Sequence, residues 1–170
     1  MLSGLAIEQR KAAFSKDKKY RYALERKWSI GTNVVCFIGL NPSIADEYID
    51  DPTITRLTHF AKNLWGFDSF YIVNLFAYRS TDPTRLLEVK DPIGPENDGW
   101  IRKLVDRSVM VVAMWGNSGK LNQRNLRVLE DLKDRVIYCF GTTLDLHPKH
   151  PVRLGYNTEL EIYSDRTNEK

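Results

Sequence analysis

Val34-Val35-Cys36-Phe37-Ile38-Gly39-Leu40-Asn41-Pro42-Ser43 is the stretch of this sequence that decides its fold. Five apolar residues precede a group of turn formers, a pattern typical of a strand buried on both faces. Gly39 has no Cβ and permits close approach, and Pro42 forces the chain out of the sheet. Asn41 is therefore predicted to stand at the carboxyl end of a central strand, where open α/β sheets bind ligands. The alternative is a simple turn in which Asn41 bonds its own backbone and Ser43 caps the next segment.

Three further apolar runs have the same character as this strand, and they cover residues 70–75, 109–116 and 136–141. Helical patterns lie between them, beginning at Asp51-Pro52 and Pro95 and covering Leu121–Lys133. Strands and helices that alternate at these lengths suit right-handed crossovers. The prediction is one domain over residues 1–170, a three-layer α/β/α fold with a mainly parallel central sheet.

Local patterns give finer expectations for the helices. Asp51 is a favoured N-cap and Pro52 a favoured first helical residue. One buried stripe is predicted at Ile54, Leu57, Phe60, Ala61 and Leu64. A second is predicted at Leu126, Leu129 and Leu132.

The two ends of the chain have weaker patterns. Residues 4–19 suggest a short helix or a loose arm, and residues 164–170 a frayed tail. Alternation over Tyr20–Trp28 indicates a strand near an edge, with the Lys and Arg residues between 10 and 27 on a solvated surface. Residues 159–163 suit a last strand or a short helix.

The composition restricts the classes of function. The 170 residues are 42% hydrophobic and 28% charged, with a net charge of +3, which permits a nucleic-acid partner without requiring one. Cys36 and Cys139 are expected to be buried free thiols, as in a reducing cytoplasm. No cysteine spacing suits zinc or an iron–sulfur cluster, and no apolar run reaches the length of a membrane span. We therefore predict a cytoplasmic protein without metal, cofactor, secretory signal or membrane partner; nothing in the sequence indicates the oligomeric state.

Each buried strand is followed by a distinctive group at its carboxyl end. These groups are Asn41, Asn74, Trp115-Gly116, and a loop that contains His147 and His150. A parallel sheet would gather them at one rim and form a cleft with polar groups and aromatic walls. An Asn amide both donates and accepts, which suits the edge of a nucleobase.

Other residues near these strand ends extend the candidate binding set. Phe76, Tyr78 and Trp115 are candidates for stacking on a planar ligand, and Arg79 and Lys149 for holding phosphate. The alternatives are that Trp115 belongs to the core and that the Asn residues satisfy turns. The full candidate set for substrate binding is Gly39, Leu40, Pro42, Ser43, Asn74, Phe76, Tyr78, Arg79, Trp115 and Gly116.

The order of these motifs resembles the uracil-DNA glycosylase superfamily. Gly39-Leu40-Asn41-Pro42 resembles the asparagine form of its first motif, which implies that Asn41 positions water. Asn74 would correspond to the Asn that recognises the uracil edge. The late His-Pro motif would correspond to His147-Pro148 or His150-Pro151. This chain has Ser43 where the asparagine branch has Gly, and it lacks the Ser-Pro that follows the late His-Pro.

The chain also resembles a bacterial and phage family known only as a domain of unknown function. The resemblance runs from residue 20 to residue 163. Its motifs here are Leu-Asn-Pro-Ser (40–43), Asp-Asp-Pro-Thr (50–53), Asn-Leu-Phe-Ala-Tyr-Arg (74–79), Asp-Pro-Ile-Gly-Pro (91–95), Trp-Gly (115–116) and His-Pro (150–151).

The glycosylase resemblance implies cleavage of an N-glycosidic bond. Asn41 would orient water, Asn74 would read the base, and His147 or His150 would donate to the departing base. An amide is not a base, so a carboxylate must help; Asp51 is the candidate, with Asp46 and Asp50 nearby, although Asp51 also suits a simple helix cap. Possible ligands are a nucleobase, a nucleotide, or single-stranded or modified DNA or RNA. A catalytically silent nucleotide binder and a base-modification enzyme remain alternatives.

Overall fold

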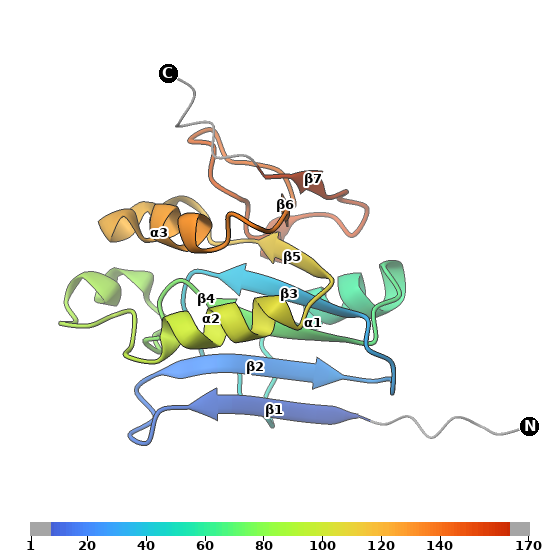
Figure 1. Cartoon of the computed structure of the whole chain (residues 1–170), viewed down its shortest axis with the longest axis horizontal. Helices are drawn as coiled ribbons and strands as arrows, with labels where there is room; N and C mark the ends of the chain where they lie inside the picture. The colour runs from blue at the N-terminus through green and yellow to red at the C-terminus, as the bar shows by residue number, and fades with distance from the viewer. Residues whose placement is uncertain (1–7, 164–170) are drawn as a thin grey trace, which may run out of the picture.

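The computed structural model describes residues 8–163. The strands in this range form one seven-stranded sheet. The order across the sheet is β1-β2-β4-β3-β5-β6-β7, and Figure 1 shows β3 and β4 near its middle. The strands are β1 (Gln9–Phe14), β2 (Arg21–Lys27), β3 (Val34–Gly39), β4 (Ser69–Asn74), β5 (Met110–Ala113), β6 (Ile137–Cys139) and β7 (Glu161–Ile162).

The sheet is mixed, with a parallel centre and antiparallel edges. β3 pairs in parallel with β4 and β5, and β5 pairs in parallel with β6. β1 and β2 on one side, and β7 on the other, run antiparallel to their neighbours. The α/β class is therefore as predicted. The carboxyl ends of four central strands meet at one rim, where the antiparallel β2 begins.

Strand β3 separates two apolar clusters, because successive side chains point to opposite faces of a sheet. Cys36 and Ile38 belong to the cluster that contains residues of α2 (Asn97–Asp106) and α3 (Arg124–Asp131). Val35 and Phe37 belong to the other cluster, with residues of α1 (Pro52–Thr58) and the helical segment that continues it. All six residues of β3 are buried, as the sequence predicts.

Helix α1 begins as predicted, with Asp51 as its N-cap and Pro52 as its first residue. Its buried stripe includes Ile54 and Leu57 and continues into the segment His59–Leu64. Leu64 itself is 49% exposed, so that part of the prediction is wrong. The segment His59–Leu64 has wider π-type turns, which rotate its last residue away from the core.

Two expectations for the amino-terminal region are wrong. Residues 9–14 form strand β1 and are not a helix or a loose arm. β1 pairs along the outer side of β2, so β2 lies near an edge as predicted, but Arg21 and Arg26 are buried and are not on a solvated surface. Residues 1–7 and 164–170, where loose ends were expected, lie outside the described residues. Residues 161–162 form strand β7, one of the two alternatives for that segment.

Helix α3 is shorter than predicted. The two residues before it, Asn122 and Gln123, have left-handed backbone angles (φ of 52° and 54°), which stop the helix from extending toward Leu121. Val128 is buried and Leu126 is 37% exposed, so the apolar stripe is rotated from the predicted one. Leu132 of the predicted stripe is buried, and so is Arg124, which donates to the Leu75 carbonyl (2.7 Å).

Candidate functional site

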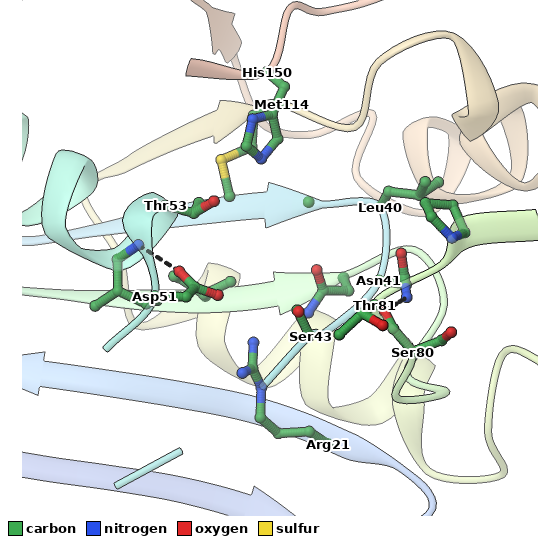
Figure 2. A pocket seen from close by; sticks show the side chains of 15 residues that line it. Arg21, Leu40, Asn41, Ser43, Asp51, Thr53, Ser80, Thr81, Met114 and His150 are labelled. Carbon is green, nitrogen blue, oxygen red and sulfur yellow. Dashed lines mark hydrogen bonds between the residues drawn. The ribbon is translucent and has the colours of Figure 1, made fainter. Parts of the chain in front are cut away.

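A cavity of about 230 Å³ lies at the carboxyl ends of β3 and β4. Figure 2 shows His150 and Met114 on one side of it and Arg21 and Ser43 on the other. Its lining combines polar and apolar groups and comes from strand ends, the loops that follow them and the start of α1. The lining residues are Arg21, Gly39, Leu40, Asn41, Ser43, Asp51, Thr53, Ile54, Ile72, Asn74, Ser80, Thr81, Pro83, Met114 and His150.

Gly39 and Asn74 are paired residues at the ends of adjacent parallel strands. A Cβ on Gly39 would lie 2.7 Å from the Asn74 Oδ1 atom, so only glycine leaves room for this amide. Asn74 is 3% exposed, and its buried Nδ2 has no hydrogen-bond partner within the described residues. Burying an amide N–H without an acceptor lowers the stability of the fold. Asn74 therefore has an unused donor, and it lines a cavity.

Asn41 holds the loop that follows β4. Its Nδ2 donates to the Ser80 carbonyl (2.9 Å) and to the Pro42 carbonyl (3.3 Å), and the Ser80 N–H donates to the Pro42 carbonyl (3.0 Å). Within residues 8–163 the Asn41 Oδ1 atom takes part in no hydrogen bond, so it remains an acceptor at the cavity. Asn41 therefore both satisfies a turn and faces the cavity.

Arg21 is a cavity residue that the sequence pattern assigned to a solvated surface. Regular alternation would put Arg21 on the same face as Ala23. Two consecutive β1 residues pair with Arg21 and Ala23, so Tyr22 is an extra residue that forms a β-bulge. Tyr22 stacks on Trp100 of α2, with ring centroids 6.4 Å apart, and Arg21 turns to the opposite, α1-facing side. The bulge thus directs Arg21 into the cavity.

The Arg21 guanidinium is deeply buried and weakly satisfied. It is 3% exposed, its Nη1 donates to the Ala45 carbonyl (2.5 Å), and its buried Nε has no partner within the described residues. Burial lowers the pKa of Arg21 to about 10, although the field of Asp51 opposes this shift. Figure 2 shows the side chain reaching from β2 toward Ser43.

Asp51 and His150 complete the ionisable groups of the cavity. Asp51 caps α1 by accepting from the Ile54 N–H (2.9 Å). The His150 Nδ1 accepts from the Val152 N–H (3.2 Å), so its neutral ring carries the proton on Nε2. Desolvation lowers the pKa of His150 below its ordinary value, with Asp51 acting in the opposite direction. Near pH 7 His150 is therefore a neutral donor.

The structure brings part of the predicted site together. Of the four predicted catalytic residues, Asn41, Asp51 and His150 line the cavity. His147 is buried beside the loop of Thr143 and does not line it. Of the binding set, Gly39, Leu40, Ser43 and Asn74 line the cavity, whereas Pro42, Phe76, Tyr78, Arg79, Trp115 and Gly116 do not.

The aromatic walls expected from the sequence are not in the cavity. Phe76 and Trp115 are buried in the cluster under α2 and α3, because their side chains leave the strand ends on that face. Tyr78 packs edge-on against Tyr20, and Arg79 lies over the ring of Phe14 at 4.7 Å. The cavity is consequently lined by amides, hydroxyls and charged groups together with aliphatic side chains.

The other carboxylates of the acidic loop have structural partners. Asp46 accepts from the N–H groups of Tyr48 and Ile49 (2.7 and 2.8 Å). Asp50 forms ion pairs with Arg10 and Arg26, both at 2.8 Å. Asp51 is therefore the carboxylate of this loop that lines the cavity.

Eight lining residues were not predicted as part of the site, and most give no local signal. Met114 stands one position before the predicted Trp115-Gly116 group, and alternation along that strand was the signal that would have found it. The others come from β2, β4, the start of α1 and the loop after β4, and their presence in the cavity depends on how these segments pack. They are Arg21, Thr53, Ile54, Ile72, Ser80, Thr81 and Pro83.

Among residues 8–163, no three His, Cys, Asp or Glu side chains are grouped to hold a metal ion. In the same range, no helix has the length and apolar character needed to cross a membrane.

Fold and cavity together define the class: an α/β protein with a polar cavity at the carboxyl ends of its parallel strands. The model of the family described as "protein of unknown function (DUF1643)" matches residues 21–152, and the chain belongs to this family. The matched range begins at Arg21 and includes every residue that lines the cavity. No curated protein and no solved structure matched the chain.

Proposed function

We propose that this chain is a uracil-DNA-glycosylase-like protein of three-layer α/β/α architecture that binds a nucleobase or nucleotide in the cavity and cleaves its N-glycosidic bond. The observation that carries the proposal is the unpaired Asn74 amide, buried at the strand ends and lining a cavity. A nucleobase carbonyl would accept a hydrogen bond from the Asn74 Nδ2, which has no acceptor within the described residues. Gly39 supports the same view, because it leaves the amide in place beside the cavity.

The remaining polar groups fit the charge changes of the reaction. Bond cleavage leaves the electron pair of the C1′–N bond on the base and creates positive charge on the sugar. His150, neutral with its proton on Nε2, donates to a carbonyl oxygen of the departing base and stabilises its negative charge. Asn74 donates to a second acceptor on that base.

Water must attack the sugar on the side away from the base. In the proposed reaction the Asn41 Oδ1 atom accepts a hydrogen bond from this water, while its Nδ2 stays with the Ser80 carbonyl. The water oxygen forms a bond to C1′, and its proton passes to the Asp51 carboxylate, whose Oδ1 is held by the Ile54 N–H. The proton is later returned to the base. Asp51 thus supplies the basic group that an Asn-only site lacks.

A base-release assay by mass spectrometry tests the proposal. The substrates are single- and double-stranded DNA, RNA and mononucleotides that carry uracil, thymine, hypoxanthine or modified pyrimidines. Release of a free base by the wild type is expected, with a decrease of about 100-fold or more in Asp51→Asn. Asn is also a favoured N-cap, so this variant keeps the start of α1.

Two further variants make the test specific. Asn74→Ala removes an amide that holds no protein group, and it is expected to abolish release. Asp131→Asn is the control for the loss of a carboxylate, because Asp131 is exposed on α3 and does not line the cavity. Binding of nucleotides without release of base from any substrate would replace the proposed enzyme with the catalytically silent binder. Absence of both would refute the proposal.

A further inference from the structure

The Arg21 guanidinium is buried, and no carboxylate within residues 8–163 forms an ion pair with it. In the same range the Ala45 carbonyl is its one hydrogen-bond acceptor. Asp51 and Asp46 act on it electrostatically from a distance, and two other arginines, Arg26 and Arg79, oppose them. A buried charge is normally paired or bound to a ligand, because its desolvation costs several kcal/mol. Arg21 therefore has the capacity to bind an anion that enters the cavity.

The backbone is built to place this cation. The bulge at Tyr22 interrupts the alternation of β2 and turns Arg21 from the α2 side to the cavity side. β-Bulges redirect side chains and are frequent beside active sites. Without the bulge, the guanidinium would point into the cluster that contains Ala23.

Hydroxyl groups stand in the same cavity. In the described part of the chain the hydroxyls of Ser43 and Thr53 form no hydrogen bond with protein, and both residues are half-buried cavity residues. The Ser80 hydroxyl is different, because it donates to the Asp82 carbonyl (2.8 Å). The Thr81 hydroxyl, on an exposed lining residue, is a third without a protein partner in the described part of the chain. One guanidinium with a free N–H and three unused hydroxyl groups suit a phosphate oxygen better than they suit an apolar group.

The geometry points to a terminal phosphate as the group that Arg21 binds, which makes the ligand a free nucleoside monophosphate. The identity of the nucleoside part rests on the proposed function; the phosphate part rests on Arg21. A terminal phosphate monoester carries nearly two negative charges and reaches a buried guanidinium end-on. An internal phosphodiester carries one charge and needs room for the chain on both sides. Arg21, at 3% exposure, offers access from the cavity alone.

Isothermal titration calorimetry of the full chain tests this assignment. The ligands are uridine, thymidine, their 5′-monophosphates, inorganic phosphate and a thymidine trinucleotide without terminal phosphate. The proteins are the wild type, Arg21→Gln, Arg21→Lys and the control Arg26→Gln, whose guanidinium is also buried in β2 but is paired with Asp50. Melting temperatures establish that each variant is folded at the temperature of titration.

The measured quantity is the ratio of nucleoside Kd to monophosphate Kd within each protein. The wild type is expected to bind the monophosphate about 10- to 100-fold more tightly, the range for a charge-assisted hydrogen bond. Arg21→Gln brings the ratio to about 1, Arg21→Lys retains part of it because the charge remains without the planar fork, and Arg26→Gln leaves it unchanged. A ratio within one protein does not depend on its overall loss of affinity.

The other outcomes separate the two proposals. Equal affinity of nucleoside and monophosphate for the wild type overturns the phosphate assignment and leaves nucleobase binding intact. Trinucleotide binding as tight as that of the monophosphate overturns the terminal phosphate. Binding of inorganic phosphate that is lost in Arg21→Gln, without binding of any nucleoside, supports the anion site and overturns the nucleobase part. Absence of binding by all six ligands overturns both.

Discussion

Strand β2 carries a buried arginine at each end, and the two guanidinium groups have opposite surroundings. Arg26 donates to the Asp50 carboxylate through Nε (3.0 Å) and Nη2 (2.8 Å) and also reaches the carbonyls of Asp46, Ile49 and Glu25. Arg21 donates to one carbonyl, has a buried Nε without a partner in the described part of the chain, and lines the cavity. The first group holds the acidic loop against the sheet, whereas the second has capacity left for a ligand.

Two buried asparagines show the same contrast. The Asn97 Nδ2 donates to the carbonyls of Asn74 (2.9 Å) and Leu75 (3.1 Å), which ties α2 to the end of β4. The Asn74 Nδ2 has no partner within the described residues. Burial is therefore a poor guide to role in this molecule, because satisfied and unsatisfied groups are equally buried. The Asn97 Oδ1 is also buried without a partner within the described residues, but Asn97 lies outside the cavity, so an unpaired group indicates a ligand only where its residue also lines the cavity, as Asn74 and Arg21 do.

The largest expected effect tests the arginine pair. Arg26→Gln is expected to lower the free energy of unfolding by about 3 kcal/mol, because it leaves buried acceptors without a donor. Arg21→Gln is expected to change it by less than about 1 kcal/mol, because it removes a poorly paired charge together with one hydrogen bond. Urea unfolding at pH 7 measures both. Equal losses in the two variants would contradict the distinction between a structural and a ligand-binding arginine.

The asparagine pair gives a smaller effect. Asn97→Ala is expected to cost about 2 kcal/mol, since the Asn74 carbonyl loses its side-chain donor and the Leu75 carbonyl keeps only Arg124. Asn74→Ala should cost about 1 kcal/mol or less, because its side chain holds no protein group. Urea unfolding of both variants checks this order. A larger loss in Asn74→Ala would mean that its amide supports the fold rather than a ligand.

Gly39→Ala sharpens the comparison at the cavity itself. The new Cβ would stand 2.7 Å from the Asn74 Oδ1, so the amide is expected to be displaced from its position. We expect a stability loss of about 1 kcal/mol, at the low end for overpacking, because a side chain rather than backbone must yield. Ligand affinity should decrease by about 10-fold with the loss of one hydrogen bond. Gly99→Ala is the control, because a Cβ added there would have no neighbouring atom within 4 Å.

The parts of the site that sequence predicts are those fixed by local chemistry. Gly39, Asn41 and Asp51 follow from a strand end, a turn and a helix cap, and each of these depends on a few neighbouring residues. Arg21 does not follow, because its direction depends on a bulge and its position depends on the antiparallel pairing of β2 with β4. A rule that looks for ligands only at the carboxyl ends of parallel strands overlooks the start of an antiparallel neighbour.

The aromatic residues show that the face a side chain takes beyond a strand end is hard to predict from sequence. Phe76 and Trp115 lie at the predicted strand ends but face the cluster under α2 and α3. Which face a side chain takes just beyond a strand depends on how the loop leaves the sheet, and the Phe76 N–H is fixed by the Leu40 carbonyl (2.9 Å). Such a contact joins distant segments and is invisible in a local pattern. The residues that follow the parallel strands were therefore predictable, and the faces that their side chains take were not.

The smallest expected effect concerns His150 and the pH dependence of stability. Although His150 is exposed as a residue, desolvation of its ring lowers its pKa, so the unfolded chain takes up this proton at a higher pH than the folded chain. Between the unfolded pKa of about 6.5 and the lower folded pKa, the unfolded state binds more protons, and stability must decrease as the pH falls. His150→Gln removes this contribution, so urea unfolding curves from pH 8 to pH 5 should show a shallower decrease for the variant. An equal or steeper decrease would show that His150 is not held neutral by its surroundings. His150 would then be a charged imidazolium at mildly acidic pH. It would no longer be a neutral donor like the Asn74 amide.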